Sequence, residues 1–242
     1  VACYQVPTTL LSMVDSSIGG KTGINISAGK NLVGAFYHPK EVLIDTSFLE
    51  TLPQVEFSAG MAEVVKYGLL GDLELFERLE SLDCLHPQHP ELSTVIRRCC
   101  EIKARVVKED ERENSAEGGR ALLNLGHTYG HAVEQVAGYG VYLHGEAVAI
   151  GMAAAVEMSR LKGWGSGEDV DRVIRILKRY DLPVSLRAPL ASIDLLDAMQ
   201  QDKKVRQGII RFVAMRGLGD TFITRDIQEE TVRESLAFIG AR

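Results

Sequence analysis

The sequence predicts an α/β segment over residues 1–55, followed by a mostly α-helical domain over residues 56–242 that includes a small β-hairpin. Three observations lead to this fold class. Short β-prone apolar runs at residues 3–6 and 42–44 flank a glycine-rich stretch near the start. From Pro53 onward, apolar residues recur at the spacing of a helix. Near the end, two β-prone runs flank a turn that contains two glycines, which is typical of a β-hairpin.

The elements of the helical domain follow from where apolar residues recur. The helix after Pro53 is marked by Phe57, Met61, Val64 and Leu69, which recur at helical spacing. The hairpin is expected over residues 208–224, with β-branched and aromatic residues on both sides of its turn. Further helices are expected over residues 72–82, 91–109, 121–137, 145–162, 168–180, 192–201 and 227–239.

Composition and charge exclude two classes of protein. Apolar residues make up 45% and charged residues 25% of the 242, which is the balance of a globular protein and excludes wholesale disorder. With 27 Lys and Arg against 33 Asp and Glu, the formal charge of −6 argues against a broad electrostatic grip on nucleic acid. A local basic pocket is still compatible with this charge.

Neither a membrane span nor a disulfide framework is expected. The longest uncharged apolar run, residues 147–156, is too short to cross a bilayer, which takes about 20 residues. The four cysteines, Cys3, Cys84, Cys99 and Cys100, show no CxxC spacing. We therefore expect reduced thiols in a cytoplasmic protein.

Three of the six histidines, His127, His131 and His144, fall close together in the sequence. His127 and His131 stand at i and i+4 in an apolar segment, so they share one face of the expected helix. Three imidazoles near carboxylates suit a catalytic zinc site, which takes three protein ligands and keeps one position open. The alternative is that one histidine caps a helix and the others are hydrogen-bonded core residues.

A second candidate is the pair Glu63 and Lys66, which an i,i+3 spacing places on one face of the helix after Pro53. The residues before this pair are small or apolar, so the helix is expected to be largely buried, which weakens the interpretation of the pair as a surface ion pair. The alternative is a surface pair worth only about 0.3–0.5 kcal/mol.

The glycine-rich stretch offers an anion-binding turn. Residues 20–22, Gly-Lys-Thr, match the end of a P-loop, but that motif requires a glycine where Asp15 stands, so this interpretation fails. Backbone amides and Lys21 could still cradle an anion, with Lys30 and Asn31 adding a cation and an amide. The alternative is an ordinary connecting loop.

A polar stripe is expected on the helix that carries the first two of these histidines. Arg120, Asn124, His127 and His131 follow an i, i+4, i+7, i+11 pattern, which is a single helix face. Such a stripe on an apolar helix packs poorly, but it suits a small polyanion held beside a metal ion. Further candidate groups, each more often a solvated charge when taken alone, are Lys103, Lys203 and Lys204.

Six stretches carry most of these candidates, and they are VPTTLL (6–11), VDSSIGGKT (14–22), GKN (29–31), AEVVKYG (62–68), LLNLGHTYGHA (122–132) and LHGE (143–146). Together they resemble the dehydroquinate synthase family, the sugar-phosphate cyclases of the shikimate pathway. The stretches occur in the family's order and span nearly the whole chain. They are specific as a set, although each one alone is weak.

The resemblance implies a metal site formed by Glu63, His127 and His144, with zinc or cobalt as the ion. His131 then serves as a substrate or proton-handling residue, although spacing alone pairs it with His127. The residues implied around the phosphate, carboxylate and hydroxyls of the substrate are Lys21, Asn31, Lys66, Lys103, Arg120, Asn124 and Lys203. Those implied in contact with NAD are Thr8, Thr9, Asp15, Lys21, Lys30, Thr51, Leu52 and Glu56.

The resemblance also implies a fold and an activity. Residues 1–55 correspond to the end of the family's NAD-binding α/β domain, and residues 56–242 to its helical metal- and substrate-binding domain. Family members convert 3-deoxy-arabino-heptulosonate 7-phosphate into 3-dehydroquinate and phosphate, as NAD- and metal-dependent carbon–oxygen lyases that are commonly homodimers. We therefore expect a small phosphorylated keto-acid as the partner, and neither nucleic acid nor a membrane.

Three alternatives to this activity stay open. The first is a sister cyclase that makes deoxy-inosose or valiolone. The second is a metal-dependent alcohol dehydrogenase, which would accumulate reduced cofactor. The third is an inactive helical fragment that binds metal without turnover.

The chain departs from the family pattern in two places. It opens at Val1 without the family's pyrophosphate-binding glycine loop, so we expect a piece of a longer protein that alone binds NAD weakly or not at all. The loop between Glu113 and Arg120 is longer than is usual in the family. For that reason neither Glu113 nor Glu117 is assigned a role.

Overall fold

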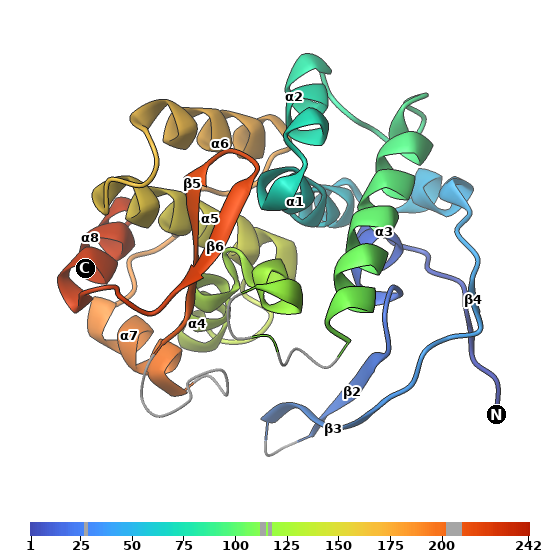
Figure 1. Ribbon diagram of the computed structural model, residues 1–242, viewed down its shortest axis with the longest axis horizontal. Coiled ribbons are helices and arrows are strands. Elements are labelled where there is room, and N and C mark those ends of the chain that lie inside the picture. The colour runs from blue at the N-terminus through green and yellow to red at the C-terminus, as the bar shows by residue number, and fades with distance from the viewer. Residues whose placement is uncertain (27–28, 112–114, 116–117, 202–209) are drawn as a thin grey trace.

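The computed structural model describes residues 1–242 except 27–28, 112–114, 116–117 and 202–209, and of the others between 25 and 32 it describes only the backbone. Helices dominate (Figure 1). The α-helices are α1 (Gln54–Gly71), α2 (Leu73–Ser81), α3 (Leu92–Glu109), α4 (His127–Ala137), α5 (His144–Leu161), α6 (Gly167–Arg179), α7 (Ser192–Gln201) and α8 (Glu229–Phe238). Three short helices are η1 (Ser12–Ser16), η2 (Thr46–Thr51) and η3 (Gly119–Asn124). The strands are β1 (Tyr4–Gln5), β2 (Lys21–Ile26), β3 (Gly29–Phe36), β4 (Glu41–Val42), β5 (Phe212–Gly217) and β6 (Asp220–Thr224).

The described residues form three separate two-stranded sheets. β1 and β4 pair in parallel, with Tyr4 opposite Glu41. The hairpin expected near the end is confirmed, because β5 and β6 pair antiparallel with Phe212 opposite Thr224. None of the described helices is long and apolar enough to cross a membrane.

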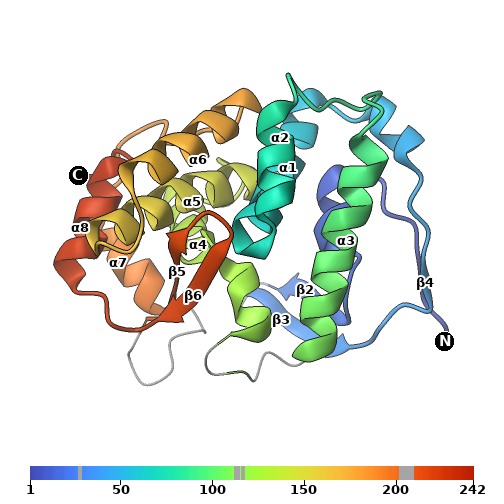
Figure 2. The same ribbon diagram turned by 45° about the horizontal axis from the view of Figure 1, so that its top comes forward.

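The glycine-rich stretch forms another hairpin, so the expectation of a turn or loop there was wrong. β2 and β3 pair antiparallel, with Gly23 opposite Gly34. A Cβ at Gly34 would come within 1.9 Å of the Thr22 carbonyl oxygen, so this glycine permits close approach of the two strands. The hairpin lies at the edge of the molecule, near the end of α3 (Figures 1 and 2).

The helix expected over residues 121–137 is two helices, η3 and α4, separated at Gly126. Gly126 has a φ of 78°, which is the left-handed conformation that interrupts a helix. A Cβ there would also meet the backbone of α5, 2.8 Å from the Val148 carbonyl oxygen. Arg120 and Asn124 therefore lie on η3, and the expected single stripe that joined them to the histidines of α4 was wrong. The other expected helices are confirmed within two residues at each end.

α5 is the central helix of the fold. It packs against α1, α4, α6, α8 and β5, and both views place it in the interior of the helical part (Figures 1 and 2). Its residues from Gly145 to Ser159 are all buried, and most are Ala, Gly, Val or Met. A helix that is apolar on every side suits a position surrounded by other elements.

Glycines bring α1, α4 and α5 unusually close together. A Cβ at Gly145 would lie 1.8 Å from the Ala59 carbonyl oxygen of α1, and a Cβ at Gly151 would lie 2.0 Å from the Gly126 carbonyl oxygen. A Cβ at Gly130 would lie 2.9 Å from the Ala147 carbonyl oxygen. These contacts place the first residues of α4 and α5 beside the middle of α1, where the candidate site lies.

Candidate metal and substrate site

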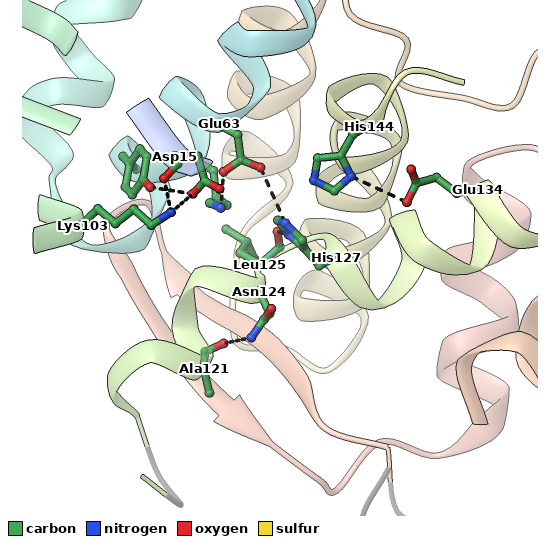
Figure 3. A network of polar contacts seen from close by, with 11 residues as sticks. Asp15, Glu63, Lys103, Ala121, Asn124, Leu125, His127, Glu134 and His144 are labelled. Atoms are coloured by element: carbon green, nitrogen blue, oxygen red, sulfur yellow. Dashed lines mark hydrogen bonds and ion pairs between the residues drawn. The ribbon is translucent and has the colours of Figure 1, made fainter. Parts of the chain in front are cut away.

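Glu63, His127 and His144 meet at one point from three different helices. Glu63 lies in the middle of α1, and His127 and His144 are the first residues of α4 and α5. One ligand atom from each of the three residues lies within 4.8 Å of the others. Figure 3 shows the two imidazoles turned toward the Glu63 carboxylate. The trio that the resemblance implied is therefore brought together by the fold.

The Glu63 carboxylate is fully buried, yet its two oxygens accept no hydrogen bond from the described residues. Its contacts are ion pairs with Lys66 and with His127, whose Nε2 lies 3.6 Å from Glu63 Oε1. A buried carboxylate without hydrogen bonds costs free energy unless a charged partner compensates it. Lys66 provides one such charge at Oε2, and a divalent cation between Glu63 Oε1 and His127 would provide a second.

The ring of His127 is oriented so that its Nε2 can act as a ligand. Its Nδ1 lies 3.1 Å from the Leu125 carbonyl oxygen, to which only a protonated nitrogen can donate. In a neutral imidazole the lone pair is then on Nε2, which faces the Glu63 carboxylate. Two acceptors that face each other call for a proton or a cation between them. One carboxylate and two imidazoles are also a donor set found in catalytic zinc sites, so the residues fit a metal ion.

Lys66 and Lys103 add two buried cations next to this trio. Lys66 is 1% exposed and forms an ion pair with Glu63. Lys103 Nζ donates to Asp15 Oδ1 over 2.7 Å, and the hydroxyl of Tyr67 donates to the same oxygen over 3.0 Å. Figure 3 shows this network beside Glu63. The sequence pattern gave no signal for Tyr67, whose hydroxyl ties α1 to η1.

Opposing effects set the pKa values in this network. Burial raises the pKa of Asp15, but the charges of Lys66 and Lys103, with the hydrogen bonds from Lys103 and Tyr67, outweigh it and lower the pKa to about 2. Burial lowers the pKa of Lys103 despite the opposing charge of Asp15. Burial also raises the pKa of Tyr67, and the neighbouring carboxylates add to the rise. Asp15 is therefore a carboxylate at neutral pH, held between an ammonium and a phenol.

His131 lies beside the trio but outside it. Its ring centroid is 5.5 Å from that of His127 and 6.1 Å from that of His144. It belongs to a second group of possible ligands, His131, Glu134 and His144, whose ligand atoms also lie within 4.8 Å of one another. The pairing of His127 with His131 that spacing suggests is thus an edge contact between two rings. The possible co-ligands of His127 are Glu63 and His144.

Glu134 was missed in the sequence. Its carboxylate lies 3.6 Å from His144 Nδ1, and it is 7% exposed. Burial lowers the pKa of His144, but the contact with Glu134 and the charges of Glu63 and Glu134 outweigh burial and raise it. The signal was available, because Glu134 follows His127 at i+7 and His131 at i+3 on the same helix face.

The remaining predicted substrate residues have mixed outcomes. Arg120 is buried, and its Nη1 donates to the Glu111 carbonyl while its backbone N–H donates to Asp110. Asn124 lies below His127 in Figure 3, with its amide donating to the Ala121 carbonyl. Lys21 is exposed at the start of β2. Lys30 and Asn31 lie in β3, but their side chains, like the whole of Lys203, are outside the described part.

Of the other predicted NAD-contacting residues, Thr8, Thr9, Thr51 and Leu52 lie before α1 in the chain and Glu56 lies in its first turn. Thr8 and Thr9 precede η1, and the Thr9 hydroxyl accepts from the Ser12 backbone N–H. Thr51 and Leu52 are at the end of η2, and Glu56 lies in the first turn of α1. Thr8 and Thr9 lie shortly before η1, which carries Asp15 and packs against α1 and α3. They are therefore close in sequence to the Asp15 network.

A cavity of about 470 Å³ lies away from all these residues, between α2 and α3. Its two arginines are already neutralised, because Arg98 pairs with Asp72 and Arg78 pairs with Glu91. These paired arginines give the cavity no cation that is available to a ligand. The convergent polar groups around Glu63 therefore make the better candidate site.

Comparison with known proteins identifies the family. The family described as 3-dehydroquinate synthase C-terminal matches residues 60–205, and the one described as 3-dehydroquinate synthase N-terminal matches residues 1–59. The chain belongs to the 3-dehydroquinate synthase family. The resemblance and the dehydroquinate synthase-like fold class inferred from the sequence are thereby confirmed.

Curated relatives carry the same name. The chain is 61% identical to a 3-dehydroquinate synthase of Opitutus terrae, over 98% of this chain and 66% of the relative. It is 49% identical to a 3-dehydroquinate synthase of Pseudoalteromonas atlantica, over 96% of this chain and 65% of the relative. The chain thus spans about two thirds of the length of the curated relatives that it matches.

Solved structures of sister enzymes have the same fold. A 2-epi-5-epi-valiolone synthase from Streptomyces hygroscopicus, with NAD⁺ and Zn²⁺ bound, matches with a TM-score of 0.87 and 28% identity, over 98% of this chain and 66% of that one. A 2-deoxy-scyllo-inosose synthase, complexed with carbaglucose-6-phosphate, NAD⁺ and Co²⁺, matches with a TM-score of 0.85 and 27% identity over the same shares.

Proposed function

We propose that this protein is a 3-dehydroquinate synthase, which converts 3-deoxy-arabino-heptulosonate 7-phosphate into 3-dehydroquinate and phosphate. The observation that carries the proposal is the meeting of Glu63, His127 and His144 beside the buried Lys66. Relatives at 49–61% identity that are named for this reaction support it. Residues 1–55 would contribute to NAD binding, and residues 56–242 would hold metal and substrate.

Glu63, His127 and His144 would hold a divalent ion, zinc or cobalt, as the ions in the solved sister enzymes suggest. When bound, the metal would polarise a substrate oxygen and NAD would accept and return a hydride. The Leu125 carbonyl keeps the His127 ring in the tautomer that a ligand requires.

The cations around this trio would bind and orient the substrate. Lys66 Nζ lies next to the Glu63 carboxylate, so it would donate to a substrate oxygen that develops negative charge there. The guanidinium of Arg120 has more donors than the Glu111 carbonyl takes up, so it would bind a phosphate or carboxylate by charge-assisted hydrogen bonds. His131, whose ring lies beside the two ligand imidazoles, would donate or accept a proton of the bound substrate.

Phosphate release without net reduction of NAD tests the proposed reaction. The assay uses a protein of the relatives' full length that contains this chain, because the chain alone is expected to bind NAD weakly or not at all. Given 3-deoxy-arabino-heptulosonate 7-phosphate, Zn²⁺ and a substoichiometric amount of NAD, we expect phosphate and 3-dehydroquinate in equal amounts and no lasting increase in nicotinamide absorbance. NAD would be regenerated in each turnover, so many turnovers per NAD are expected. Reduced cofactor that accumulates in proportion to product would contradict the proposal and indicate a dehydrogenase.

Replacement of Lys66 with methionine is expected to leave metal binding intact and to lower kcat by about 10²- to 10³-fold. Methionine fills the buried space but removes the donor that stabilises developing charge, and the loss of one such donor has about this effect. Metal content and kcat are measured on the same preparation. The exposed Lys178 on α6 supplies the matched control Lys178→Met, which should turn over normally. A near-normal kcat for Lys66→Met would remove Lys66 from the mechanism.

The second candidate function is that of a sister cyclase, making a deoxy-inosose or a valiolone. TM-scores of 0.87 and 0.85 to the two solved sister enzymes support it. Their identities of 28% and 27% are well below those to the 3-dehydroquinate synthases, which favours the first proposal. Phosphate release from the substrates of the three enzymes, compared side by side, distinguishes them.

Calorimetric measurement of NAD binding tests the view that the chain is an inactive metal-binding fragment. Measurable binding by the 242-residue chain would argue against it. The homodimer and the cytoplasmic location that the family resemblance implies stay predictions, and sedimentation of the protein would test the first of them.

A further inference from the structure

α4 carries a buried carboxylate that the proposed reaction does not use. Glu134 is 7% exposed, and its neighbours on the helix, Ala132 and Val133, are buried and apolar. A carboxylate in such a place costs free energy unless it is paired. The group that Glu134 faces beside the candidate metal site therefore decides its role.

The packing of α4 on α5 fixes what Glu134 faces. Gly126 of the loop before α4 lies against Gly151 of α5, and Gly130 lies against Ala147, so the two helices run antiparallel. One further turn along α4 from Gly130 reaches Glu134, and one turn back along α5 from Ala147 reaches His144. The contact between Glu134 and His144 thus follows from the same close packing that forms the site.

The His144 ring lies between two carboxylates. Its Nδ1 is 3.6 Å from Glu134 Oε2. In Figure 3 the other ring nitrogen points away from Glu134, toward the side where Glu63 and His127 lie. A carboxylate on one nitrogen of an imidazole keeps the proton there, fixes the ring orientation and leaves the second nitrogen as a ligand. His127 is held in the corresponding way by the Leu125 carbonyl.

We propose that Glu134 is a positioning residue that orients His144 and raises its strength as a metal ligand. The inference deepens the proposed function and rests on its metal site. Glu134 does not touch substrate in this role, and acts only through the imidazole of His144.

The test measures the affinity of the full chain for Zn²⁺ and Co²⁺ in two variants. Glu134→Gln keeps the shape and an acceptor but loses the charge, and Glu134→Ala loses both. We expect affinity to fall by up to about 10-fold for glutamine and about 10- to 100-fold for alanine. The visible absorption of bound Co²⁺ should also change in position or intensity, since a reoriented imidazole alters the ligand field. A residue that only supports the fold would leave this spectrum unchanged.

Glu157→Gln is the matched control. Glu157 is 6% exposed, lies on α5 and pairs with Arg160 over 2.6 Å, so the same substitution removes an equally buried carboxylate away from the site. Its Co²⁺ spectrum and affinity should equal those of the unmodified chain. If Glu134→Ala does not fold, the nearly isosteric Glu134→Gln still decides the matter.

Two results would overturn the inference. One is unchanged affinity and an unchanged Co²⁺ spectrum in both Glu134 variants. The other is a stoichiometry of two ions per unmodified chain and one per Glu134→Ala chain, with the remaining ion bound as tightly as in the unmodified chain. Glu134 would then be a direct ligand, with His131, of a second metal site. His127→Ala separates these failures from failure of the proposed function. If His127→Ala keeps full metal affinity, the metal site itself is wrong; if it loses the metal while the Glu134 variants do not, only this inference fails.

Discussion

Replacement of His144 with alanine is expected to remove bound metal and turnover together. A catalytic zinc is typically held by three protein ligands, so loss of one leaves two donors and weaker binding. The buried Glu63 would then depend on Lys66 and His127 alone for compensation. A metal ion that activates a substrate oxygen is worth several kcal/mol, so kcat should fall by about 10³-fold or more.

The measurement is metal content after dialysis, with phosphate release assayed on the same sample. His86→Ala is the matched control, because His86 is an exposed histidine in the connection between α2 and α3, away from the trio. It should keep both metal and turnover. Full zinc occupancy in His144→Ala would refute the assignment of His144 as a ligand.

Much of the helical architecture could be predicted because burial imposes a period on the sequence. In α6 the buried residues are Val170, Val173, Ile176 and Leu177, which recur at helical spacing. The hairpin β2–β3 could not be predicted in the same way. Its glycines look like turn residues in the sequence, and only the pairing of Gly23 with Gly34 shows that they permit close strand approach.

Gly126 illustrates why helix breaks are hard to read. A single glycine inside an apolar periodic run costs a helix only about 1 kcal/mol, so the pattern favours one continuous helix. The break follows from tertiary packing, since the Gly126 carbonyl lies against Gly151 of α5. Without knowledge of that partner, the separation of Arg120 from His127 onto different helices could not be foreseen.

The candidate site was predictable only in part, for a related reason. Spacing pairs His127 with His131, because both lie on one helix, whereas Glu63 and His144 lie on two other helices, α1 and α5. Glu63 and His144 were both candidates from the residues alone, but only the family resemblance grouped them with His127 as one ligand set, and the fold brings the three together. Glu134 was overlooked because a lone glutamate on a helix is usually solvated, and its burial depends on how closely α5 approaches.

The closest of these approaches leads to the second large expected effect, that of Gly145→Ala. Alanine normally stabilises a helix by about 1 kcal/mol relative to glycine. Here the added methyl would lie 1.8 Å from the Ala59 carbonyl oxygen, and backbone cannot move aside as a flexible side chain can. We expect the free energy of unfolding to fall by about 1–3 kcal/mol, as for overpacked cores. Because Ala59 lies one turn before Glu63 and Gly145 follows His144, metal affinity should fall as well.

Gly167→Ala separates this steric effect from the general effect of alanine in a helix. Gly167 begins α6, and a Cβ there would meet nothing within 4 Å. That variant should be as stable as the unmodified chain or slightly more stable, with the same affinity for Zn²⁺. Denaturant unfolding and metal titration of the two variants decide the matter. If Gly145→Ala matches Gly167→Ala in both, α1 and α5 are not held as close as the structure places them, and Glu63 and His144 lose the packing that brings them to one ion.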